Sequence, residues 1–313
     1  MNSLQYVPKS EFDRTMNMLE DPEIRCSAFA TLCRINTLYM IAYAGSGHIG
    51  SSFSSIDIVS WLYLEELERH ESGETLHIFF SSKGHDVPAL YSVLIGLGML
   101  PFEKIRTLRR LGGLPGHPDV SVDHIVANSG SLGMGISKAK GMIHAHRLNN
   151  QQRRIYVMTG DGELQEGQIW ESLRGAVNAN MGELTVIVDH NKIQSDHWVT
   201  ETNDLGDLET RFDSYGWHVQ KCNGHNLLDF AKCLNECKQS TAPSVIIADT
   251  LKGSGVSFME PHGLASKEYY RYHSGSPSAE DYNRAIAELT ETVNRYFRAN
   301  TIDPLKLKSS SHI

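Results

Sequence analysis

The chain has 313 residues, of which 40% are hydrophobic and 21% charged, a composition that excludes a disordered or fibrous protein. With 29 Lys and Arg against 37 Asp and Glu, the net charge is -8 and no basic run occurs, so no nucleic acid and no membrane is expected as a partner. No stretch of about 18 residues is apolar enough to span a bilayer, and the charged N-terminus does not resemble a secretory signal, so we expect a cytoplasmic protein. Five cysteines without a Cys-x-x-Cys pair favour free thiols over a disulfide framework.

Two helices are predicted first, over residues 24–44 and from an N-cap at Ser54 or Ser55 to residue 67, with a loop that holds His48 between them. Five units of strand, loop and helix follow, with strands over 77–80, 125–127, 155–158, 184–188 and 245–248. This alternation predicts an α/β fold with a central, mostly parallel sheet and helices on both faces.

The organisation of the chain indicates a single domain. No internal repeat, low-complexity tract or Gly/Ser/Pro linker interrupts residues 20–298, so we predict one domain over residues 21–298. Residues 1–20 form an N-terminal extension and residues 299–313 a C-terminal tail. Both ends are expected to be loosely held.

Unusual polar residues follow several of the predicted strands. His85, Asp161, Asn191 and Lys252 each stand in such a loop. In open α/β folds ligands bind outside the carboxyl ends of the strands, so we expect these four residues to share one crevice. Loops are polar in general, and any one of these residues taken alone could be there by chance.

A glycine-rich turn at the end of one strand predicts a site for a metal ion and a diphosphate. Asp161 stands between Gly160 and Gly162, and Asn191 ends the next strand, one βαβ crossover further along. The Asp161 carboxylate, the Asn191 amide oxygen and the Ile193 carbonyl form a set of hard oxygen ligands for Mg²⁺ or Ca²⁺. The glycines let the main chain approach a diphosphate closely. The alternative is an ordinary Asp-Gly turn followed by an Asn-Lys helix start.

These motifs resemble those of a known family. GDGELQEG with Asn191 resembles the thiamine diphosphate motif, and the chain from Arg25 to Leu289 resembles the N-terminal, diphosphate-binding domain of transketolases. The supporting strings, in chain order, are GSGHIGSSFSSIDI, SSKGHDVPALYSVL, GLPGHPD, NSGSLGMGISKAKG, GDGELQEGQIWES, DHNKIQSD and DTLKGSGVSFME. The resemblance implies the thiamine-diphosphate-binding fold. It also indicates the first polypeptide of a split transketolase, because the chain stops where a fused enzyme would continue into its pyrimidine-binding and C-terminal domains.

Three histidines stand directly after glycines in loops: His48, His85 and His117. By resemblance they line the channel to the reactive carbon of the thiazolium. Imidazole suits this task, because it can hydrogen-bond several hydroxyls and move protons near neutral pH. A single histidine is often only structural, and this interpretation is kept for His190 and His218.

The family has a further site histidine near the end of this domain, in a Trp-His-Gly context from which this sequence departs. A Pro-His-Gly string contains His262, and extra residues separate it from His273, whose register relative to the following helix fits better. We therefore assign His273 rather than His262 to the site. The added segment, with Tyr269, Tyr270 and Tyr272, either reshapes the acceptor pocket or forms a surface excursion.

The resemblance also implies contacts to the cofactor. Gly130 and Gly162 match main-chain contacts, and Leu132 matches a residue that packs on the cofactor. Glu166 and Glu171 match carboxylates near the two-fold axis that connect paired sites. Each glutamate could instead be a capping charge in the first turns of a helix.

The implied activity is transfer of a two-carbon ketol unit from a ketose donor to an aldehyde acceptor, with thiamine diphosphate and a divalent cation as cofactors. By resemblance, the glutamate that contacts N1′ of the aminopyrimidine belongs to the pyrimidine-binding domain. We therefore expect this chain to be inactive alone and to act with a C-terminal transketolase subunit in a heterotetramer of two copies of each (α₂β₂). Sugars or sugar-phosphate-like compounds are the expected substrates.

Two other interpretations stay open. An α-type chain of a 2-oxo acid dehydrogenase or decarboxylase shares the GDG…N pattern, but the three Gly-His loops argue against it. A catalytically silent cofactor-binding subunit would keep the motifs without using the histidines. A nicotinamide-binding domain is excluded, because no G-x-G-x-x-G string opens a first βαβ unit.

Overall fold

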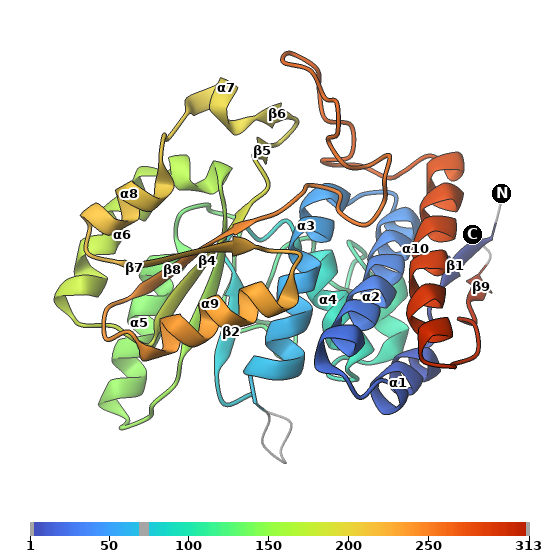
Figure 1. Ribbon diagram of the computed structural model, residues 1–313, viewed down its shortest axis with the longest axis horizontal. Helices are drawn as coiled ribbons and strands as arrows, with labels where there is room; N and C mark the ends of the chain where they lie inside the picture. The colour runs from blue at the N-terminus through green and yellow to red at the C-terminus, as the bar shows by residue number, and fades with distance from the viewer. Residues whose placement is uncertain (1–2, 69–74, 311–313) are drawn as a thin grey trace.

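The computed structural model describes residues 3–68 and 75–310 (Figure 1). Its centre is a five-stranded sheet in the order β2-β3-β4-β8-β7, in which every neighbouring pair is parallel. The strands are β2 (Ile78–Ser81), β3 (Ile155–Gly160), β4 (Leu184–His190), β7 (His218–Asn223) and β8 (Ser244–Asp249). The α/β fold with a parallel sheet is therefore confirmed.

Helices surround this sheet, and four of them begin at a residue whose side chain caps the first turn. The Asp21 side chain accepts a hydrogen bond from the Ile24 N–H at the start of the long second helix, and Gly45 ends that helix in the left-handed region at φ 73°. The helices are α1 (Lys9–Met18), α2 (Pro22–Ala44), α3 (Ile49–Trp61), α4 (Val87–Gly96), α5 (Gly135–Leu148), α6 (Gly167–Asn178), α7 (Val199–Asn203), α8 (Leu208–Ser214), α9 (Leu227–Gln239) and α10 (Ala279–Ala299).

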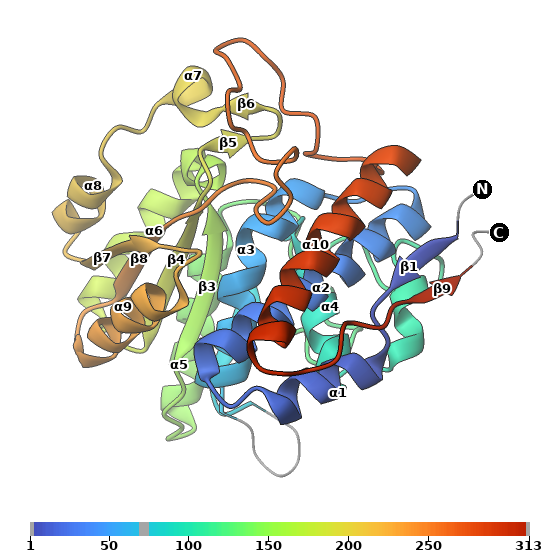
Figure 2. The ribbon, with the colours of Figure 1, turned by 45° about the vertical axis from the view of Figure 1, so that its right-hand side comes forward.

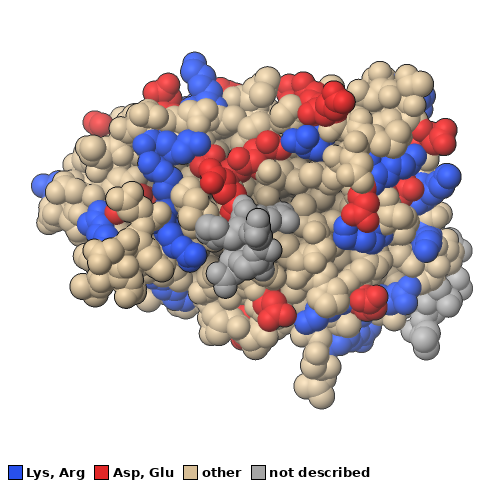
Figure 3. All heavy atoms as spheres, turned by 90° about the horizontal axis from the view of Figure 1, so that it is seen from below, with Lys and Arg blue, Asp and Glu red and all other residues tan. Residues whose placement is uncertain are grey.

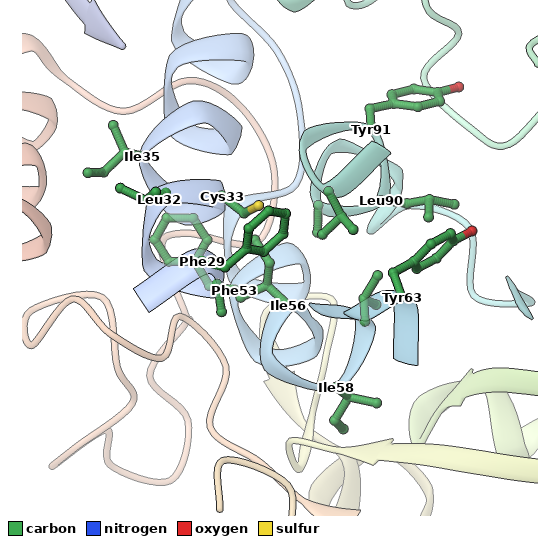
Figure 4. Close-up of a cluster of buried hydrophobic side chains, with 14 of the residues drawn as sticks. Phe29, Leu32, Cys33, Ile35, Phe53, Ile56, Ile58, Tyr63, Leu90 and Tyr91 are labelled. Atoms are coloured by element: carbon green, nitrogen blue, oxygen red, sulfur yellow. The ribbon is translucent and has the colours of Figure 1, made fainter. Parts of the chain in front are cut away.

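Both faces of the sheet are buried, as parallel sheets require. Side chains alternate along β3, so that Ile155 and Val157 face one core and Tyr156 and Met158 the other. The first core includes side chains of α5, α6 and α8, and the second includes those of α2, α3, α4 and α9. Figure 4 shows the second core between α2, α3 and α4, and Figure 2 shows α10 lying along α2.

The start of α3 differs from the prediction. The helix begins at Ile49, and Ser54 and Ser55 lie inside it with fully buried side chains. The Ser55 hydroxyl donates to the Ser51 carbonyl at 2.9 Å and the Ser54 hydroxyl donates to the Asp189 carboxylate at 2.7 Å, so that both buried serines remain satisfied within the helix. The expected N-cap at these positions is therefore wrong, because the local preference of serine for helix starts is overridden by tertiary packing.

The predicted strand over 125–127 is also wrong. Ile125 and Ala127 are buried, at 8% and 6% exposure, but their backbone is irregular and forms no ladder with the sheet. A short apolar run indicates burial more reliably than it indicates a strand, and here the long segment between residues 107 and 134 packs as a loop.

The two ends of the chain are held rather than loose. Strand β1 (Leu4–Tyr6) pairs antiparallel with β9 (Lys308–Ser310), and Figure 1 shows these two strands side by side. The Tyr39 hydroxyl lies 2.7 Å from the hydroxyl of Ser310, and Phe12 is fully buried. The expectation of loose ends is therefore wrong for the described residues, because these segments contribute apolar side chains to the core.

Several surface properties agree with the composition. Within the described residues no helix is long and apolar enough to cross a membrane. On the face seen in Figure 3, Lys and Arg are interspersed with Asp and Glu over the part of the chain that is described. All five cysteines are free and buried, which confirms the prediction against a disulfide framework.

Candidate active site

A cavity of about 680 Å³ lies where the strands of the central sheet end. The loops after β2, β3, β4 and β8 supply part of its lining, and the start of α3 supplies another part. The structure brings together in this cavity every residue that the sequence assigned to catalysis or to the cofactor, namely His48, His85, His117, Gly130, Leu132, Gly160, Asp161, Gly162, Glu166, Asn191, Ile193 and His273. Lys252 lines it as well.

Asp161 occupies the end of β3, beside β4. Its Oδ1 accepts a hydrogen bond of 2.7 Å from the Gly162 N–H, and its Oδ2 accepts one from the Lys192 N–H. Burial and the nearby charge of Asp189 raise the pKa of Asp161 to about 6. A buried carboxylate that is short of positive partners is suited to a cation.

Asp189 organises the neighbouring strand end. This fully buried carboxylate accepts hydrogen bonds from the Lys83 ammonium at 2.5 Å, from the hydroxyls of Ser54 and Thr250, and from the Asn191 amide at 3.1 Å. Burial would raise the pKa of Asp189, but Lys83 together with the hydroxyls of Ser54 and Thr250 lowers the pKa to about 2. The hydrogen bond to Asp189 thus fixes the orientation of the Asn191 amide, and the amide oxygen accepts a hydrogen bond of 3.1 Å from the Ile193 N–H.

The oxygen set fits a divalent cation that is shared with an anionic ligand. The Ile193 carbonyl accepts from the Lys252 ammonium at 2.8 Å, and its second lone pair is available to a metal. One carboxylate and two neutral oxygens are few ligands for a divalent cation. In the described part of the chain, no group of three His, Cys, Asp or Glu side chains could hold a metal. A Mg²⁺ or Ca²⁺ ion here would therefore need phosphate oxygens and water to complete its shell.

Two glycines that line the cavity have different surroundings. A Cβ on Gly162 would stand 2.6 Å from the Cβ of Gln194, too close for any side chain. Gly130 has φ 128°, a conformation that favours glycine. The backbone is therefore open to a ligand at Gly130, where nothing lies within 4 Å of a built Cβ, whereas at Gly162 the missing side chain makes room for Gln194.

Three of the four histidines form a compact group. The ring centroids of His48 and His85 are 5.1 Å apart, as are those of His48 and His273, and His85 and His273 are 5.8 Å apart. Burial, with the positive charge of Arg109, lowers the pKa of His48 to about 4, and burial lowers the pKa of His273 to about 3. These rings are neutral at neutral pH. They can therefore donate and accept hydrogen bonds to sugar hydroxyls.

The added segment, residues 262–273, packs against the cavity in one part and is exposed to solvent in another. His262 lies outside the cavity, with a side chain that is 67% exposed and pairs with Glu260 at 2.9 Å. Tyr270 is buried with its ring over the Lys252 ammonium, whereas Tyr269 is 63% exposed and contacts His197. Figure 1 shows this loop projecting beside β5 (Ile193–Gln194) and β6 (His197–Trp198).

The remaining predicted positions lie apart from the cavity. Glu171 is an exposed residue of α6 that does not line it, whereas the exposed Glu166 does. His190 and His218 stand at the ends of β4 and β7 outside the lining.

Glu163 is a site residue that the sequence analysis missed. Its buried carboxylate accepts hydrogen bonds from the Gly133 N–H at 2.8 Å, from the Gly160 N–H at 3.1 Å and from the hydroxyl of Ser82. It therefore ties together three loops of the cavity, and burial raises its pKa. The available signal was its place in the same turn as Asp161.

Comparison with known proteins identifies the family. Residues 26–269 match the thiamine diphosphate binding domain of transketolase. The chain is 36% identical over 280 residues to the 6-deoxy-6-sulfo-D-fructose transketolase subunit SqwG of a Clostridium species, covering 87% of this chain and 98% of that protein. It is 33% identical over 262 residues to one of the apulose-4-phosphate transketolase subunits of Phocaeicola vulgatus, covering 82% and 91%.

A solved transketolase has the same fold. The transketolase of Campylobacter jejuni superimposes with a TM-score of 0.73 at 26% identity, covering 89% of this chain and 43% of that one. The chain thus spans less than half of that enzyme and nearly all of the two relatives that are named as subunits. It belongs to the transketolase family of transferases and contains the family's thiamine-diphosphate-binding domain.

Proposed function

We propose that this chain is the N-terminal subunit of a two-subunit transketolase, which transfers a two-carbon ketol unit from a ketose donor to an aldehyde acceptor. The observation that carries the proposal is the convergence of His48, His85 and His273 with the Asp161 and Asn191 oxygens on one cavity. The relatives named as transketolase subunits support it. They also favour it over an α-type chain of a 2-oxo acid dehydrogenase.

The residues of the diphosphate end would hold the cofactors. Asp161, Asn191 and the Ile193 carbonyl would ligate Mg²⁺, or Ca²⁺, together with the diphosphate. The main chain at Gly130, Gly160 and Gly162 would approach the diphosphate, and Leu132 and Glu166 would contact the cofactor. Lys252 adds positive charge at the same end, although burial lowers its pKa to about 8.

Thiamine diphosphate, when bound, supplies the carbanion stabilisation needed to break and form the carbon–carbon bond. The chain's own task is to orient the sugar and to move protons on its oxygens. His85 donates its Nδ1–H to the Lys83 carbonyl at 2.8 Å, so its Nε2 can accept a proton from a hydroxyl. His117 and His273 would bind further hydroxyls along the channel.

A second subunit would complete the site. We propose that this partner is a C-terminal transketolase subunit, which carries the pyrimidine-binding domain and its glutamate, and that the two form a heterotetramer. The domain boundaries at residues 21 and 298 are part of the same proposal. The substrates would be sugars with an anionic group, since the relatives are named for a sulfo-sugar and a sugar phosphate.

The test combines this chain with the partner subunit encoded by a neighbouring gene. We expect ketol transfer, measured as aldehyde released from a ketose phosphate or sulfonate, only from the mixture with thiamine diphosphate and Mg²⁺. Activity of this chain alone would contradict the proposed division of labour.

Binding is measured separately from activity. Titration calorimetry of the assembled pair should detect uptake of thiamine diphosphate that depends on Mg²⁺ and disappears in Asp161→Ala. Uptake that is indifferent to Mg²⁺ and to this substitution would contradict the metal site. A silent subunit would be indicated if His48→Ala and His117→Ala left the complex fully active.

A further inference from the structure

One arginine outside the predicted site contacts the loops of two site histidines. The Arg109 guanidinium donates a hydrogen bond of 2.7 Å to the Ser46 hydroxyl through Nη1, and its Nη2 lies 3.5 Å from Nδ1 of His48. Arg109 has φ 54°, a left-handed conformation that non-glycine residues rarely adopt. Its N–H donates to the Leu114 carbonyl at 2.7 Å, which holds this backbone in place.

The same guanidinium lies against the loop that carries His117. A Cβ built on Gly116 would stand 2.8 Å from Nε of Arg109 and 3.3 Å from its Cζ. The absence of a side chain at Gly116 therefore permits the approach. Arg109 thus connects the loop before His48 with the loop before His117.

The contact with His48 has a chemical consequence. An arginine side chain only donates hydrogen bonds, so Nδ1 of His48 must accept. A neutral His48 then carries its proton on Nε2. His85 is the reverse, because the Lys83 carbonyl accepts its Nδ1–H and leaves Nε2 as an acceptor. The two rings, 5.1 Å apart, therefore present opposite hydrogen-bonding characters.

We propose that Arg109 is a positioning residue that fixes the tautomer of His48 and holds the His48 and His117 loops together. The pair of rings then offers one donor, on His48, and one acceptor, on His85, to neighbouring oxygens of the sugar. Such a fixed pair suits proton movement between adjacent hydroxyl and carbonyl oxygens. This inference rests on the proposed transketolase function.

The charges around His48 are consistent with this role. The groups that face its ring are His85, His117, His273, Arg109 and Lys252, and none of them is acidic. Arg109 itself forms no ion pair with a carboxylate among residues 3–68 and 75–310. Its positive charge therefore acts on the histidines without local neutralisation, and it favours their neutral form.

The first test is nitrogen NMR of the histidine rings in the full chain. The His48 signals, identified by their loss in His48→Gln, should show the Nε2–H tautomer and stay neutral well below the ordinary pKa of histidine. In Arg109→Gln we expect a mixture of tautomers and a pKa that moves toward the ordinary range. Arg110→Gln is the matched control, because Arg110 lies next in the chain and donates to the Tyr43 carbonyl instead of a histidine.

The second test is kinetic and uses the assembled enzyme. Arg109→Gln should lower kcat/KM by about tenfold to a hundredfold through misplacement of the histidines, whereas Arg110→Gln should not. Arg109→Lys should restore the neutral state of His48 and only part of the rate, because an ammonium cannot donate to Ser46 and His48 from two separate nitrogens. If Arg109→Gln does not fold, Arg109→Met, which also removes the charge, carries both measurements.

Two results would overturn the proposal. One is an unchanged His48 tautomer and pKa in Arg109→Gln, or in Arg109→Met where that variant replaces it. The other is an increase of KM confined to substrates with a terminal phosphate or sulfonate while the His48 signals stay unchanged, which would make Arg109 an anion-binding residue. Failure of the proposed function would look different, since the wild-type pair would then lack ketol transfer whatever the NMR of this chain showed.

Discussion

The two ends of the cavity are built on different principles. At the diphosphate end, Asp161 and Asn191 follow neighbouring strands and are 4% and 5% exposed, and the fully buried Asp189 holds Asn191 in place. At the other end, His48, His117 and His273 stand in loops, half-buried or exposed. The sheet therefore fixes the first end, whereas the second depends on a few contacts between loops. We expect substitutions at the first end to change stability and those at the second to change the rate.

The largest expected effect is on the rate, at the histidine end. His273→Ala in the assembled enzyme should lower kcat/KM by about 10²–10⁴-fold, the usual contribution of a group that handles protons. Thermal unfolding of this chain should change little, because His273 stands in a loop at the open cavity, where its ring packs against those of His48 and His85.

His262→Ala is the control for this measurement, since His262 is exposed, lies outside the cavity and pairs with Glu260. Its kinetics should equal those of the wild type. A larger loss in His262→Ala than in His273→Ala would reverse the assignment of the last site histidine.

The next effect is on stability, at the diphosphate end. Lys83→Met removes the buried partner of Asp189 and should lower the free energy of unfolding by about 3–5 kcal/mol, because a charge is left buried and uncompensated. Lys221→Met, which breaks the exposed pair with Glu209, should cost less than about 1 kcal/mol. Urea unfolding of the cofactor-free chain measures both free energies, and equal effects would contradict the stabilising role of the buried Lys83–Asp189 pair at the diphosphate end.

Glu163 should give an intermediate effect. Glu163→Gln keeps the shape of the side chain but puts an amide NH₂ where backbone N–H groups of Gly133 or Gly160 donate, so one buried donor loses its acceptor. We expect a loss of about 1–3 kcal/mol in unfolding free energy. Affinity for thiamine diphosphate should fall as well, because the loops of Gly130 and Gly160 are released together. Loss of stability with unchanged affinity would show that Glu163 has no part in the site.

The two ends of the cavity also differ in how much of their structure could be predicted from the sequence. The adjacency of Asp161 and Asn191 follows from the length of a βαβ crossover, which local pattern and sheet geometry determine. The buried Glu163, the Arg109 contacts and the embedding of Ser54 in α3 depend on residues far apart in the chain. Local preferences carry no information on such contacts. Resemblance to a family, not geometry, was the basis for grouping His48, His117 and His273.

The smallest effect concerns the acid stability of the histidine end. The folded chain holds His48 at a pKa of about 4, below the ordinary value of about 6.5. Between these two values the unfolded chain binds a proton that the folded chain does not. The stabilisation is therefore complete above the ordinary pKa and is lost as the pH falls toward the folded one.

His48→Gln removes this proton difference, so it should flatten the decline of stability below about pH 6.5, by at most about 1.4 kcal/mol per pH unit. The measurement is urea unfolding of the chain at a series of pH values, with the exposed His262→Gln as the matched control. A decline that is equally steep in His48→Gln and in the wild type would mean that the loops release this ring before it is protonated. The histidine end would then be looser than its packed rings indicate, and the second subunit would have to order it.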